Sequence, residues 1–448
     1  MKHLGIFLFL SLFSGFAAPV EGAEVAGRST IYDRDPNHLW NRLNETLFDR
    51  TAQDAKRYGL DELDILYWGK TKHLLVEPSH HAALAILDEF IKKHGEKLIH
   101  DPLKRALLQR DLWELFDWSA RSSFRTSSDL RACRNLQPRL VTVIRRLALT
   151  TNEIALLPEN YAQSENGGAA GLPAGLMQTN GDWIVAGIAG YSDWSVAPFH
   201  IVQFDGHSAF SVLLNVPKGR VAAISYLDSL RLFKQHHRIL TYRTNTFSSF
   251  WTNSPDEVLD LNPRVPQFPT NTEWALVRRM CVIDTEGRIQ PTRFTESIQV
   301  RRYLDPKREI PDLRFSTNDV QEFFEFQMDR RHGGMLRAIG QNETGFVFVH
   351  GGTGIDLFED SDWFHADESQ LRDSKLLQAK VLGNCYQCHS GPGIFSVNSY
   401  TASVSPLPQE KPNDLAPIEI SRDDRAAVDW KQQQFNWGLL QGLWRQAN

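Results

Sequence analysis

The sequence of 448 residues contains only four cysteines and five methionines. Four cysteines are too few to hold together a fold of this length, which excludes a disulfide-built scaffold. Long runs of like charge are missing too, and the net charge of -5 at pH 7 offers no basic surface for nucleic acid. Beyond the N-terminus no apolar run approaches the length of a membrane span, so we expect no integral membrane segment there.

The N-terminus has the layout of a secretory signal. Residues 1–3 form a short basic start, an apolar run extends from Leu4 to Ala18, and small residues follow up to Ala23. We therefore predict a signal peptide over residues 1–23 and a mature protein that is periplasmic or extracellular. An uncleaved membrane anchor is the alternative, although the apolar run is shorter than a typical membrane span.

The remaining chain predicts an α+β fold in three regions, of which the first, residues 24–160, is helical. Helix start signals occur at Asp35-Pro36, Ser79 and Asp101-Pro102, and each is followed by apolar residues at helical spacing. A further helix is predicted over 140–147, after a proline that would end or kink a helix.

Residues 161–355 are predicted to mix helices with antiparallel strands. The clearest hairpin joins strands over 274–283 and 288–303 across the turn Asp284-Thr285-Glu286-Gly287. We therefore expect an antiparallel sheet in this region. The other predicted elements are a helix over 220–232 and strands over 183–188, 210–216, 321–328 and 345–350.

The C-terminal region contains the motif with the clearest chemistry. Cys385-Tyr386-Gln387-Cys388-His389 matches Cys-x-x-Cys-His, in which two thiols form thioethers to one haem and the imidazole ligates its iron. A redox disulfide would favour a βαβ setting, and a zinc site would need a second ligand pair; the sequence shows neither. We therefore predict one covalent haem c, with Cys385 and Cys388 as anchors and His389 as the iron ligand.

The stretch from about 365 to 448 resembles a small mono-haem c-type cytochrome domain of class I. Apolar residues at helical spacing lead into Cys385, and a last helix is predicted from Ser421, in the order typical of the family. The resemblance implies a small α-helical cytochrome c-like domain over 356–448, with electron transfer as its function. It also implies that the carbonyl of Pro392 accepts the imidazole N–H of His389.

The usual sixth iron ligand of this family is missing. Class I domains carry a methionine between the motif and the last helix, but residues 390–448 contain neither Met nor His. An open sixth position would let the iron bind peroxide or small gases. Two alternatives to electron transfer therefore remain: a peroxidase-like haem oxidoreductase, and a structural or interaction protein with a vestigial haem site. The upstream residues able to supply the ligand are Met328, His332, Met335, His350 and His365.

The larger upstream part shows no recognisable catalytic motif. We expect this part to bind either a redox partner protein or a small-molecule substrate. Asp205-Gly206-His207-Ser208 brings acid, base and nucleophile types together, but neighbours on a strand face opposite ways and the Gly-x-Ser-x-Gly elbow is missing. Cys133 and Cys281 are interpreted either as one disulfide or as two buried thiols.

Overall fold

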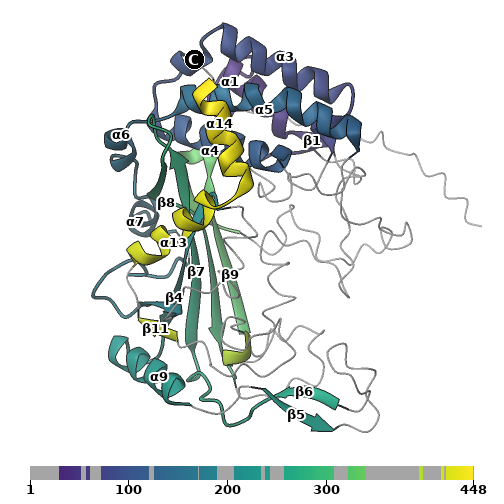
Figure 1. The fold of residues 1–448 in the computed structure, drawn as a ribbon. Helices are drawn as coiled ribbons and strands as arrows, with labels where there is room; N and C mark the ends of the chain where they lie inside the picture. The colour runs from purple at the N-terminus through teal and green to yellow at the C-terminus, as the bar shows by residue number, and fades with distance from the viewer. Residues whose placement is uncertain are drawn as a thin grey trace, which may run out of the picture.

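The computed structural model describes twelve stretches of the chain. A helical layer packs against one end of a long antiparallel sheet, and a single helix covers the other end (Figure 1). The α+β class predicted from the sequence is confirmed. The described stretches are 30–51, 57–60, 72–120, 126–169, 171–188, 206–233, 238–242, 257–306, 321–339, 393–396, 415–417 and 420–446.

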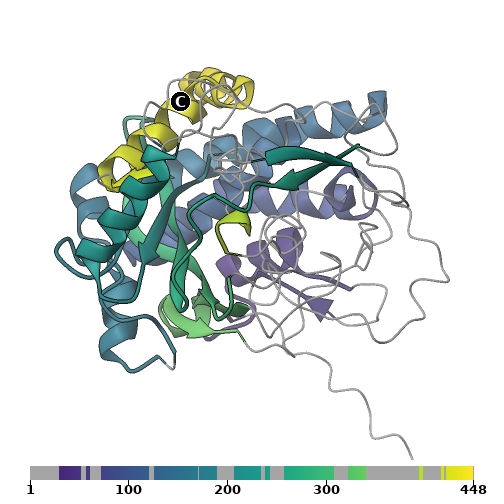
Figure 2. The same ribbon diagram turned by 90° about the horizontal axis from the view of Figure 1, so that it is seen from below.

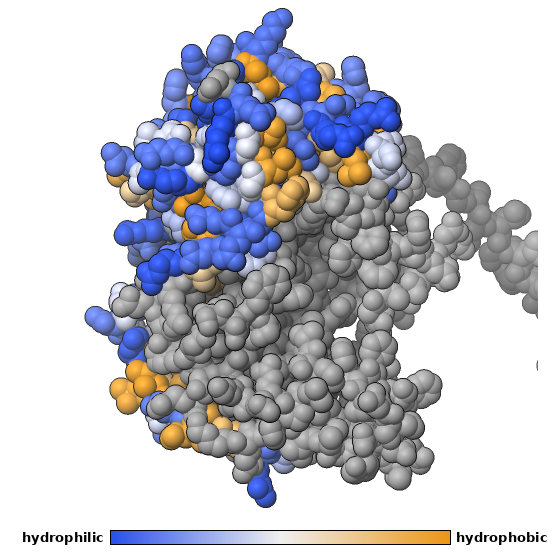
Figure 3. All heavy atoms as spheres, viewed as in Figure 1, coloured by the Kyte–Doolittle hydropathy of each residue, from blue (hydrophilic) through white to orange (hydrophobic). Residues whose placement is uncertain are grey.

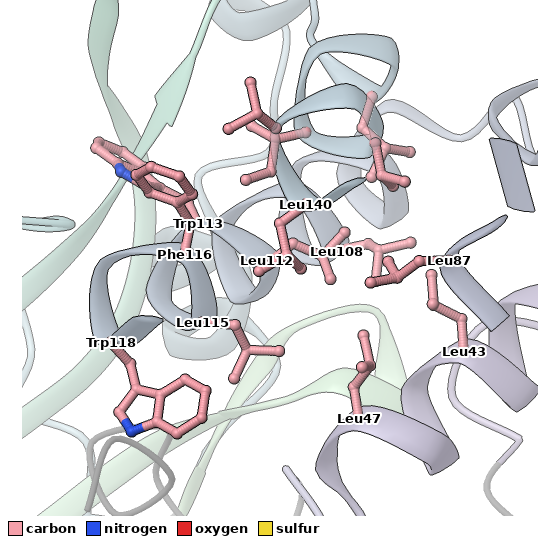
Figure 4. Close-up of a cluster of buried hydrophobic side chains, with 14 of the residues drawn as sticks. Leu43, Leu47, Leu87, Leu108, Leu112, Trp113, Leu115, Phe116, Trp118 and Leu140 are labelled. Atoms are coloured by element: carbon pink, nitrogen blue, oxygen red, sulfur yellow. The ribbon is translucent and has the colours of Figure 1, made fainter. Parts of the chain in front are cut away.

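Four helices build the helical layer, and their apolar faces meet in one core. Leucines of all four, among them Leu43, Leu87, Leu112 and Leu140, point toward one another between the helices (Figure 4). Two short helices then lead toward the sheet. The four helices are α1 (Leu39–Phe48), α3 (Ser79–Lys92), α4 (Pro102–Ala120) and α5 (Ser127–Leu147), and the short ones are α6 (Thr151–Ala155) and α7 (Asn160–Asn166).

The start of α4 follows the sequence signal, whereas the start of α5 does not. The Asp101 carboxylate accepts hydrogen bonds from the backbone N–H groups of Leu103 (2.8 Å) and Lys104 (3.2 Å), as an N-cap does. The prediction that a helix begins after Pro138 was wrong, because α5 runs through that proline. The helix begins instead at a capping box formed by Thr126 and Asp129. The cap and a buried apolar face outweigh the proline's cost of about 3 kcal/mol.

The predicted hairpin forms the centre of the sheet. Its turn is closed by Asp284, whose Oδ1 accepts from the backbone N–H groups of Glu286 (3.0 Å) and Arg288 (2.9 Å). The strand order is β10-β9-β8-β7-β4-β3-β11, with every neighbouring pair antiparallel. The strands are β3 (Ile184–Ile188), β4 (Ser208–Asn215), β7 (Thr272–Ile283), β8 (Ile289–Tyr303), β9 (Gln321–Asp329), β10 (Met335–Ala338) and β11 (Leu415–Pro417).

The end of the sheet away from the helical layer has its own apolar cluster. Helix α9 (Arg220–Leu232) packs there against β3 and β4, at the position predicted from the sequence. The ring of Phe268 packs against two other aromatic rings of this cluster. Its centroid lies 4.8 Å from that of Tyr303 and 5.7 Å from that of Trp274. Two short two-stranded sheets complete the described strands: β1 (Arg50–Thr51) with β2 (Arg57–Tyr58), and β5 (Arg238–Tyr242) with β6 (Glu257–Leu261).

The C-terminal residues return to the helical layer. The single last helix predicted from Ser421 is two helices, α13 (Ile420–Gln432) and α14 (Phe435–Gln446). They lie beside the helical layer and the sheet (Figure 2). Trp437 and Trp444 are buried in the same core as α1, α4 and α5. The last helix therefore packs with the first helices of the chain.

Other sequence predictions lie outside the described residues: the signal peptide, the strand over 345–350, the helix leading into Cys385, and the boundary at 356. Among the helices that the structure describes, none is long and apolar enough to cross a membrane. On the face shown in Figure 3, the described helical layer carries apolar side chains scattered among polar ones.

Candidate functional site

The three residues predicted to hold haem, Cys385, Cys388 and His389, lie outside the described residues, as do His350 and His365. The chemistry of the donor set itself fits haem c, since two thiols and one imidazole are the groups that the attachment uses. The structure describes Gly393–Ser396, which follow the motif in sequence. It also describes three of the upstream ligand candidates, Met328, His332 and Met335.

The three described ligand candidates lie at the β9–β10 connection. The side chain of His332 is 77% exposed, and its Nδ1 lies 2.8 Å from Asp329 Oδ2. Met335 Sδ lies 4.0 Å from Ser164 Oγ, and Met328 is partly buried against the apolar clusters on the sheet. Each of these side chains thus has a local structural role.

The first described segment after the motif lies at the opposite end of the sheet. Gly393–Ser396 forms a short 3-10 helix, η6, and the side chain of Ile394 is completely buried in the cluster that contains Phe268 and Tyr303. In Figure 1 this segment is the yellow-green turn at the lower end of the sheet. Gly393, four positions after His389, therefore lies near the end of β8.

Strand register gives the separation between these two places. Tyr303 pairs with Gln321 and Met335 pairs with Asp329, and these two β9 residues are eight residue steps apart. Eight strand residues span about 26 Å, whereas four residues after His389 reach at most about 14 Å. The described candidates for the sixth ligand thus lie about eight residue steps along β9 from the strand end at which Gly393–Ser396 packs.

A second polar site, not predicted from the sequence, is buried between α4 and the sheet. Every residue of α4 from Ala106 to Ser119 is buried. Three of its charged residues, Arg110, Glu114 and Asp117, follow one another at spacings of four and three, which places them on one helical face. That face meets β4, β8 and α13. Charges at helical spacing inside a helix rich in leucine and aromatic residues were the available sequence signal.

His207, just before β4, joins two of these carboxylates. Its Nδ1 lies 2.8 Å from Glu114 Oε2, and its Nε2 contacts Asp117 Oδ2. The same Asp117 oxygen accepts a hydrogen bond from Lys431 Nζ, which comes from α13. The ring of Trp113 closes the site edge-on against the imidazole, at 4.7 Å between centroids. Three separate chain segments therefore converge on one buried network.

Glu296 supplies the third carboxylate because of a β-bulge. Arg278 pairs with Ser297 and Arg279 with Thr295, which leaves Glu296 as the extra residue of β8. Its Oε1 lies 2.7 Å from Arg110 Nε, and its Oε2 accepts a hydrogen bond from Ser208. The bulge thus turns an acidic side chain toward the helix.

Hydrogen bonding in this network requires one extra proton. An ionised carboxylate only accepts hydrogen bonds, and a neutral imidazole carries one N–H. Since His207 meets a carboxylate at each ring nitrogen, either the ring is an imidazolium or Glu114 or Asp117 is protonated. The other charges balance. Arg110, Arg278 and Lys431 contribute three positive charges against three negative charges from Glu114, Asp117 and Glu296.

The network has a structural character. His207 and Ser208 are both completely buried, and they contact different carboxylates of this network. Within the described stretches no group of three or more His, Cys, Asp or Glu side chains is arranged to hold a metal ion. Cys133 and Cys281 are both buried and form no disulfide with each other, and burial raises the pKa of Cys281 to about 12.

The chain was also compared with known proteins. No protein-family model, no curated protein and no solved structure matches it.

Proposed function

We propose that this chain is an exported protein that binds one haem c covalently and transfers electrons through it. The proposal rests on the Cys-x-x-Cys-His motif formed by Cys385, Cys388 and His389. The N-terminal signal pattern supports it, because c-type haem is attached outside the bacterial cytoplasm. In this proposal the two thiols form thioethers and His389 ligates the iron. The bound haem supplies a one-electron redox centre.

A second candidate function, a peroxidase-like haem oxidoreductase, is favoured by the missing sixth ligand. Residues 390–448 offer neither Met nor His. The described upstream candidates lie about eight residue steps along β9 from the strand end at which Gly393–Ser396 packs. An iron without a strong sixth ligand binds exogenous molecules. The substrate in that case is a small oxidant such as a peroxide, and the electron donor is a second protein or a small molecule.

Haem staining after denaturing electrophoresis tests covalent attachment. We expect a stained band for the exported wild-type protein and none for Cys385→Ala/Cys388→Ala. A matched control is Cys133→Ala, which removes a buried thiol outside the motif and should keep the stain. An unstained wild-type band would refute haem binding and leave the structural or interaction protein as the explanation.

Carbon monoxide separates the two haem functions. A ferrous spectrum that carbon monoxide does not change would show a six-coordinate iron and support electron transfer alone. A shifted Soret band, together with peroxide-dependent oxidation of an artificial donor, would support the oxidoreductase.

A further inference from the structure

We propose that Gln267 and Tyr303 clamp the segment Gly393–Ser396 and so act as positioning residues for the haem motif that precedes it. This inference rests on the proposed function, and it adds which described residues fix the haem in the molecule. The clamp consists of two side chains from separate elements, one on the loop before β7 and one at the end of β8, which meet the same short helix η6.

Gln267 holds the beginning of η6. Its Oε1 accepts hydrogen bonds from the backbone N–H of Ile394, at 2.7 Å, and from that of Phe268, at 2.9 Å. Gly393 has φ +52, and a Cβ added there would overlap Gln267 Oε1 and lie 2.8 Å from Pro306 Cβ. The backbone approach therefore requires glycine at this position.

Tyr303 holds the end of η6. The Ser396 hydroxyl donates to the carbonyl of Gly393, at 2.8 Å, and it also contacts the Tyr303 hydroxyl. A hydroxyl has one proton, so Tyr303 is the donor in that contact. Burial raises the pKa of Tyr303, which keeps its phenol protonated and able to donate. Ile394, between the two contacts, is completely buried.

The clamp can restrict the haem because the chain between His389 and Gly393 is short. Gly393 is four positions after His389, so the backbone of His389 lies within about 14 Å of the clamped backbone, and the haem that it would ligate is tied there by this length plus the histidine side chain. The clamp sits on rigid structure, because Tyr303 ends a strand of fifteen residues and its ring packs 4.8 Å from Phe268. Loosening the clamp should leave thioether chemistry intact but let the haem change its orientation.

The test compares two glycine substitutions in the full-length, haem-loaded protein. Gly393→Ala introduces the overlap with Gln267. Gly168→Ala is the matched control, since Gly168 also has positive φ (+73) but nothing lies within 4 Å of an added Cβ. Both variants carry similar backbone strain, so a difference between them reports the clamp. Tyr303→Phe is a third variant, which removes only the hydroxyl donor to Ser396.

Three measurements are made on each variant: haem stain, circular dichroism in the Soret band, and reduction potential. We expect Gly393→Ala and Tyr303→Phe to keep the stain, to lose Soret circular dichroism and to shift the potential, while Gly168→Ala matches wild type. Soret circular dichroism responds to how a haem is fixed among its neighbours, which loss of global stability at another place does not change.

Each outcome decides the proposal. Wild-type values of dichroism and potential in both Gly393→Ala and Tyr303→Phe would overturn the clamp while leaving haem binding intact. Equal changes in Gly168→Ala and Gly393→Ala would also overturn it, because backbone strain alone would then be the cause. A wild-type protein without covalent haem would refute the proposed function, and the clamp's role with it.

Discussion

Replacing Lys431 by methionine should destabilise the protein strongly. The side chain is completely buried, and its Nζ donates to Asp117 Oδ2 across the contact between α13 and α4. Methionine fills a similar volume but leaves the network with one positive charge fewer around a buried carboxylate. Breaking a buried ion pair by removing one partner costs about 3–5 kcal/mol, and we expect a loss in this range in the free energy of unfolding.

The matched control is Lys93→Met. Lys93 also pairs with a carboxylate, Glu89, at 2.8 Å, but its side chain is 62% exposed. Exposed pairs of this type contribute about 0.3–0.5 kcal/mol, so the two lysine variants should differ in stability by several kcal/mol. Urea unfolding followed by far-ultraviolet circular dichroism measures the free energy of unfolding of both variants. If the dependence of this free energy on urea concentration is the same as in wild type, a change in midpoint reports a change in stability.

A double-mutant cycle then tests whether the pair is the cause. In Lys431→Met/Asp117→Asn both charges of the contact are gone, and the double variant should lose less than the sum of the single losses, by about 0.5–3 kcal/mol. The reasoning is refuted if Lys431→Met costs no more than Lys93→Met, or if the two losses simply add. In either case the buried network would not couple α13 to the helical layer.

Two further predictions concern ionisation. Hydrogen bonds from Arg42 and Lys93 lower the pKa of Glu89 from 4.5 to about 2, so the stability that this carboxylate contributes is present above pH 4.5 and is lost as the pH falls toward 2. Because the pair is partly exposed, we expect about 1 kcal/mol at most; Arg42→Met should flatten this part of the acid-unfolding curve, and an unchanged curve would contradict the assignment. Burial raises the pKa of Cys281 to about 12, so its thiol should resist alkylation at pH 8 until the chain unfolds. The unfolded protein should then titrate two thiols if haem occupies Cys385 and Cys388, and four if it does not.

The sequence by itself determined the elements whose signals are local. The turn from Asp284 to Gly287 predicts the β7–β8 hairpin, and Asp101-Pro102 predicts the start of α4, because each signal acts through hydrogen bonds to the next few residues. The haem prediction is of the same kind, since it depends on three residues within five positions. It stays a prediction, because those residues lie outside the described stretches.

Tertiary structure alone decided how these elements combine. Asp117 contacts His207, 90 residues away, and Lys431, 314 residues away, and no local pattern encodes partners at such separations. The same holds for the clamp, in which Ile394 reaches Gln267, 127 residues earlier. Hydrophobic periodicity shows that a helix has an apolar face, but whether its charged face is solvated or buried depends on what the rest of the chain places against it. For α4 that is β4, β8 and α13, and their packing turns an ordinary polar helix face into a buried charge network.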